Sequence, residues 1–106
     1  MNNFEKMKKY LISDFIFMLV INAYFVIDSI LEVSLLGTGS SNLITSLLSV
    51  LLLIAGIIFS KKGENTGGII GIVVGVLMIL GGALINVLLG IFMTIHSITY
   101  LIKKNK

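Results

Sequence analysis

Two acidic residues in the first half of the chain have the spacing that a small ion or proton site needs. Asp28 and Glu32 lie four residues apart, so a helix would place both carboxylates on one face. Two such carboxylates can share a proton or a cation, because their mutual repulsion raises one pKa. With Asn86 and Asn42 they form a candidate buried polar or ion site. The competing interpretation is that both acids only decorate one end of a long helix.

A second candidate pair is Asp14 with His96, the single histidine. Asp14 falls in the same sector of the first helix as Asp28 and Glu32 at ~100° per residue. In the arrangement of helices argued below, His96 reaches a similar depth, and we predict that it contacts Asp14. Beside a carboxylate, histidine can relay protons, although a lone histidine in an apolar helix more often only hydrogen-bonds a neighbour.

Other chemistry is missing from the sequence. The absence of cysteine excludes disulfides, cysteine-ligated zinc and cysteine nucleophiles. Two carboxylates are too few hard ligands for a metal site, so we expect none. No glycine-rich phosphate loop, histidine-rich motif or plausible catalytic triad is found. The sequence therefore predicts a protein that is not an enzyme and that has no cofactor.

The composition is that of an integral membrane protein. Of 106 residues, 57% are apolar and 12% are charged, whereas soluble domains have about 45–50% and about 25%. The basic residues are all lysines, grouped at residues 6–9, 61–62 and 103–106. Such short basic tracts beside apolar runs orient membrane helices, and they lack the contiguous basic face that nucleic-acid binding needs.

The apolar tracts divide into four membrane spans. About 20 mainly apolar residues cross a bilayer, and the first two tracts predict spans over residues 10–35 and 43–60. The uncharged tract 67–102 would be about 54 Å long as one helix, against a hydrocarbon core of ~30 Å. A turn at Gly81 and Gly82 divides it into spans over residues 66–81 and 84–102.

Four spans place all eight lysines on one side of the membrane, and lysine-rich segments stay in the cytoplasm. We therefore predict an all-α membrane protein, a compact bundle of four transmembrane helices in a bacterial cytoplasmic membrane, with both termini cytoplasmic. A cleaved signal peptide is the alternative for the first tract. It is disfavoured because the tract is long, contains Asp28 and Glu32, and lacks a small-x-small cleavage site.

Small residues predict where the helices pack. Gly67, Gly71 and Gly75 form two overlapping GxxxG steps, which allow the close approach of another helix of the chain or of a second copy. The second span has a matching stripe of small and polar residues at spacings of three, four and seven. We predict that this stripe packs against another helix; it includes Ser46, Ser49 and Gly56.

In size, topology and use of lysine without arginine, the chain resembles the small four-span membrane proteins of Gram-positive bacteria. That resemblance implies an accessory subunit, an immunity protein or a factor for envelope integrity, which acts through helix–helix contacts. Its partners would be the lipid bilayer, a larger membrane protein or further copies of itself.

The small multidrug transporters are a second comparison, because they too have about this length, four spans and an essential acid in the first span. Asp14 would be the nearest match. However, their acid is a glutamate, and they are rich in tryptophan and proline, both absent here. The alternative function is thus a proton- or cation-coupled transporter or channel that uses the acids of the first helix. Holin-like pores are disfavoured by those acids.

Overall fold

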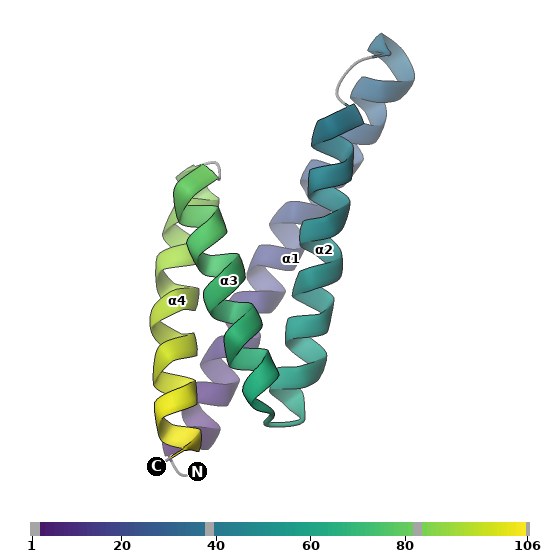
Figure 1. The fold of residues 1–106 in the computed structure, drawn as a ribbon. Coiled ribbons are helices and arrows are strands. Elements are labelled where there is room, and N and C mark those ends of the chain that lie inside the picture. Colours follow the sequence, from purple (N-terminus) through teal and green to yellow (C-terminus); the bar gives the residue numbers. More distant parts are fainter. Residues whose placement is uncertain (1–2, 38–39, 82–83, 106) are drawn as a thin grey trace.

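The structure, a computed structural model, describes residues 3–37, 40–81 and 84–105, and nearly all of these residues are helical (Figure 1). Four helices make up this described part: α1 (Asn3–Leu36), α2 (Ser40–Lys61), α3 (Asn65–Gly81) and α4 (Leu84–Lys104). The predicted all-α fold with four helices is therefore confirmed. The tract 67–102 forms two helices, as predicted; α3 ends at Gly81, and Gly82 lies outside the described residues.

Glycines end the first two helices. Gly37 has a φ of 69°, and its N–H donates to the carbonyl of Val33 at 3.1 Å, which closes the last turn of α1. Gly63 has a φ of 72°, and the next residue, Glu64, donates its N–H to the carbonyl of Phe59 at 3.1 Å. This Schellman-type end turns the chain from α2 directly into α3.

The helices form two antiparallel hairpins of unequal length, α1–α2 and α3–α4, which lie side by side (Figure 1). Both chain ends and the α2–α3 connection lie at the same end of the molecule, and all the described lysines belong to these segments. We call this the basic end. At the opposite end, α1 and α2 extend beyond the shorter α3–α4 hairpin, and the two hairpins diverge (Figure 1).

The apolar core fills the half of the molecule near the basic end. Its fully buried side chains include Leu11 and Phe15 of α1, Leu53 of α2, and Met93 and Tyr100 of α4. The Tyr100 hydroxyl donates to the carbonyl of Glu64 at 2.8 Å and so ties α4 to the start of α3.

The α3–α4 hairpin depends on a very close approach of two backbones. A Cβ atom placed on Gly75 would lie 2.9 Å from the carbonyl oxygen of Gly90, and one placed on Gly90 would lie 2.7 Å from the carbonyl oxygen of Gly75. Only residues without a side chain fit at this crossing. Because glycine has no Cβ atom, the two helices approach closely and gain van der Waals contact along their length.

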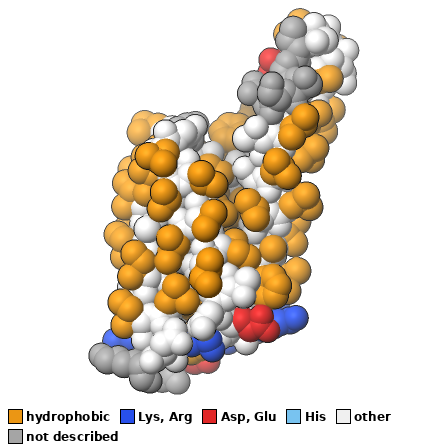
Figure 2. All heavy atoms as spheres, in the orientation of Figure 1, with side chains coloured by type: hydrophobic (Ala, Val, Ile, Leu, Met, Phe, Trp, Pro, Cys, Tyr) orange, Lys and Arg blue, Asp and Glu red, His pale blue; other side chains and the backbone are white. Residues whose placement is uncertain are grey.

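The outer surface of the helices is apolar over most of its area (Figure 2). Among the described residues, three helices are long and apolar enough to cross a membrane: α1, the α2 segment Leu43–Lys61, and α4. The fourth, α3, is a shorter apolar helix of 17 residues. These features indicate a membrane protein, because a soluble protein could not expose so large an apolar area.

The Gly75–Gly90 contact yields a prediction for stability. Gly75→Ala should lower the free energy of unfolding by about 1–3 kcal/mol, because the new methyl group has no space beside the Gly90 carbonyl. Gly81→Ala is the matched control, since its Cβ would meet nothing within 4 Å. The two variants would be unfolded with SDS in mixed micelles and followed by circular dichroism. Equal stability of both variants would contradict the proposed close packing.

Candidate functional site

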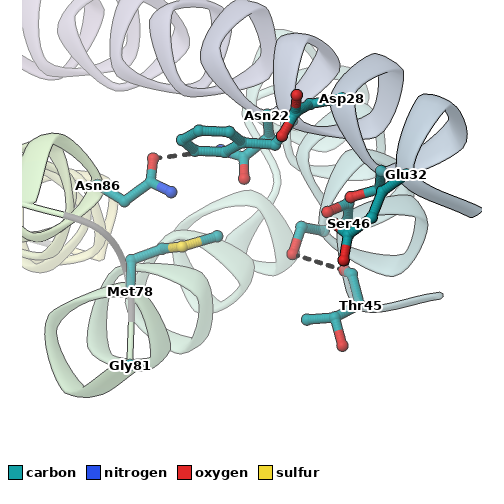
Figure 3. A pocket seen from close by; sticks show the side chains of 11 residues that line it. Asn22, Asp28, Glu32, Thr45, Ser46, Met78, Gly81 and Asn86 are labelled. Carbon is teal, nitrogen blue, oxygen red and sulfur yellow. Dashed lines mark hydrogen bonds between the residues drawn. The ribbon is translucent and has the colours of Figure 1, made fainter. Parts of the chain in front are cut away.

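A polar cleft opens between the two hairpins on the side away from the basic end (Figure 3). It has a volume of about 320 Å³, and every helix contributes to its walls. Its residues are Asn22, Phe25, Asp28, Ser29, Glu32, Thr45, Ser46, Ser49, Met78, Gly81 and Asn86. The cleft exists because α3 and α4 end before α1 and α2 do, so the outer turns of the longer hairpin have only one another to pack against.

The floor of the cleft is a pair of buried asparagines from α1 and α4. Asn22 and Asn86 are each only 4% exposed, and the side-chain amide of Asn22 donates to the Asn86 side-chain oxygen at 3.3 Å. The same amide also donates to the carbonyl of Met18 at 2.8 Å. This pair joins the two hairpins where the apolar core gives way to the cleft.

The two acids are more exposed than the predicted buried site requires. The prediction that Asp28 is buried is wrong, because its side chain is exposed at the mouth of the cleft, and Glu32 is half-buried beside it. The buried face of α1 instead carries Asn22 and Ser29, and Asp28 points about 100° away from Ser29. Asn86 lines the same cleft as both acids. The side chain of Asn42 lies outside the described residues.

The small and polar residues of α2 have two different roles. Ser46 and Ser49, which the sequence predicts in a helix contact, line the cleft and are half-buried. The Ser49 hydroxyl donates to the carbonyl of Thr45 within its own helix at 3.0 Å. Gly56 does lie in a helix contact, where an added Cβ would be 2.5 Å from the ring of Phe15.

Gly67, Gly71 and Gly75 of α3 face helices of the same chain and are buried there. An added Cβ on Gly67 would overlap Ser60 of α2, and one on Gly71 would overlap the hydroxyl of Ser97 of α4. Gly75 makes the crossing with α4 described above. This face is therefore covered within one molecule, and a second copy has no access to these three glycines without separating the helices.

Asp14 and His96 are in contact, as the sequence predicts. The Nδ1 atom of His96 meets the Oδ2 atom of Asp14, which joins α1 to α4 at the depth of the apolar core. The ring of Tyr10 lies 5.6 Å from that of His96, and the ring of Phe92 lies 6.4 Å away on the same helix. The imidazole thus contacts the Asp14 carboxylate and has two aromatic rings beside it.

Buried apolar side chains separate the Asp14–His96 contact from the polar cleft. Along α1, Met18 lies one turn from both Asp14 and Asn22, and along α4, Met93 lies between Asn86 and His96. Both methionines are fully buried. The two polar groups are therefore distinct sites in this conformation.

Among the described residues, no group of three or more histidine, aspartate and glutamate side chains could hold a metal ion. Comparison of the chain with protein-family models, with curated proteins and with solved structures finds no match in any of the three. Function is therefore argued from the cleft, the ion pair and the exposed surfaces alone.

A double-mutant cycle tests the Asp14–His96 contact. Asp14→Asn and His96→Gln should destabilise the protein non-additively, with a coupling energy of about 0.5–3 kcal/mol, because each change removes the same interaction. The control cycle pairs His96→Gln with Asp28→Asn, which lies in the separate cleft and should be additive within about 0.5 kcal/mol. Equal coupling in both cycles would argue against a specific contact.

Proposed function

We propose that this chain is a four-span protein of a bacterial cytoplasmic membrane, with both termini in the cytoplasm. We further propose that it acts through helix–helix contacts as an accessory subunit, an immunity protein or a factor for envelope integrity. Its orientation is supported by the lysines, which lie in segments at one end of the molecule. At 17 residues, α3 is within the range of about 17–25 that a span requires.

The observation that carries the binding role is the uncovered end of the α1–α2 hairpin. We call Leu31, Leu35, Leu36 and Ile44 the hairpin tip; all four side chains are exposed. The predicted span 10–35 of α1 would be about 39 Å long, which exceeds the ~30 Å hydrocarbon core. Leucines that extend past the lipid need another apolar surface, and a helix of a larger membrane protein supplies one.

Transport is the less favoured function. A carrier or channel needs polar groups that connect the two sides of the membrane. The cleft and the Asp14–His96 pair are candidates, but the fully buried Met18 and Met93 separate them. A transporter would have to rearrange this packed core in every cycle, whereas a binding protein uses the same structure without change.

Accessible cysteines test the orientation, since the chain has none of its own. In intact cells, a membrane-impermeant maleimide should label Leu36→Cys, which replaces an exposed residue at the far end of α1. Asn65→Cys, at the start of α3, should be labelled only after the membrane is permeabilised. The reverse pattern, or labelling of both in intact cells, would refute the proposed topology.

Photocrosslinking in native membranes tests the partner. A benzophenone amino acid at Leu35, which is 78% exposed, should form an adduct with one protein that mass spectrometry identifies. The control is the same group at Val73, which is exposed on the middle of α3 and should give lipid adducts only. Adducts between copies at Leu35 would indicate a homo-oligomer, and the absence of any protein adduct would contradict the binding role.

A further inference from the structure

The floor of the polar cleft has hydrogen-bonding atoms that the protein itself does not use. The Asn22–Asn86 bond occupies the side-chain nitrogen of Asn22 and the oxygen of Asn86. Within the described residues, no group bonds to the remaining oxygen of Asn22 or the remaining nitrogen of Asn86. Figure 3 shows both side chains directed toward the cleft. Both residues line the open cleft, so these free atoms are available to bond a ligand there.

The mouth of the cleft has negative charge that the protein does not balance. In the part of the chain that the structure describes, neither Asp28 nor Glu32 has an ion-pair partner. The lysines lie in segments at the basic end, on the other side of the apolar core. Two carboxylates on successive turns of α1 therefore face the same opening with no cation supplied by the fold.

The arrangement of donors and acceptors selects the kind of cation. The carboxylates of Asp28 and Glu32 at the mouth are acceptors, which suits an ammonium group with its N–H donors, and the free oxygen of Asn22 at the floor is an acceptor for a hydroxyl group of the same ligand. The free nitrogen of Asn86 is a donor, which suits an oxygen on the same ligand. A quaternary ammonium has no N–H to donate and needs an aromatic cage, but Phe25 is the only aromatic residue among those that line the cleft.

We propose that the polar cleft binds a primary ammonium group that carries a neighbouring oxygen acceptor, as in an amino alcohol. Two sources have this chemistry: a lipid headgroup of the ethanolamine type and a soluble amino alcohol. The proposal rests on the proposed membrane orientation, which places the cleft at the outer surface of the bilayer, where both sources reach it. A volume of about 320 Å³ is ample for a group of this size.

The binding experiment compares primary with quaternary amines. Purified protein in phosphatidylcholine nanodiscs, with and without phosphatidylethanolamine, gives the lipid arm, and protein in detergent with ethanolamine or choline gives the soluble arm. The midpoint of thermal unfolding should rise by about 4 °C or more with at least one primary amine. The matching choline compound should not raise it.

Charge-neutral variants assign the effect to the cleft. Asp28→Asn with Glu32→Gln should abolish the shift without loss of fold, because neither side chain is buried. Glu64→Gln is the control, since this exposed glutamate follows α2 at the basic end, and its variant should keep the full shift.

A shift only with the lipid identifies a headgroup as the ligand, and a shift only with ethanolamine identifies a soluble one. The proposal is overturned if neither primary amine raises the midpoint, if choline compounds act equally, or if the cleft variant keeps the shift. Cysteine labelling and photocrosslinking are independent of these results. Failure of amine binding therefore does not contradict the helix–helix proposal, and the absence of a protein adduct does not contradict amine binding.

Discussion

The contact between Gly75 and Gly90 determines the shape of the rest of the molecule. Because the two backbones almost touch there, α3 and α4 form one narrow hairpin, although the uncharged tract contains few groups that could bond them together. This hairpin is shorter than α1–α2, and the difference in length leaves the outer turns of α1 and α2 uncovered. The polar cleft and the exposed hairpin tip both follow from that difference.

Two polar pairs inside the bundle lie where the two hairpins meet. Asn22 with Asn86, and Asp14 with His96, both join α1 to α4, and the buried Met18 and Met93 lie between the two pairs. Helices in lipid gain little from the hydrophobic effect against one another, so hydrogen bonds between them and close packing determine how they associate. The two pairs thereby fix the depth of α1 relative to α4, which neither apolar face could specify alone.

Much of the fold could be predicted from the sequence, because a bilayer limits helix length. The division of the tract 67–102 followed from the length that one span allows, and the contact of Asp14 with His96 followed from their similar depths. Helix phase was harder to predict. The sector of α1 was centred on its charged residues, whereas the buried face follows Leu11, Phe15, Met18, Asn22 and Ser29 at spacings of three, four and seven. That spacing can be read from the sequence, but it does not by itself indicate that Asn22 bonds to another helix.

The divergence of the hairpins could not be predicted from any one helix, because it depends on the relative lengths of two hairpins and on their crossing angles. The sequence alone therefore does not show that Ser46 and Ser49, which it predicts in a helix contact, line an open cleft. Small and hydroxylated residues suit both environments, and only the arrangement of all four helices distinguishes them.

The uneven distribution of the core has a consequence for local stability. The basic end contains the fully buried side chains and the bond from Tyr100 to Glu64, while the outer turns of α1 and α2 contact only each other. Backbone amides should therefore exchange with solvent hydrogen by global unfolding near the core, and through smaller local openings near the hairpin tip. The molecule thus has one rigid end and one compliant end, and the compliant end carries the surfaces that are available to other molecules.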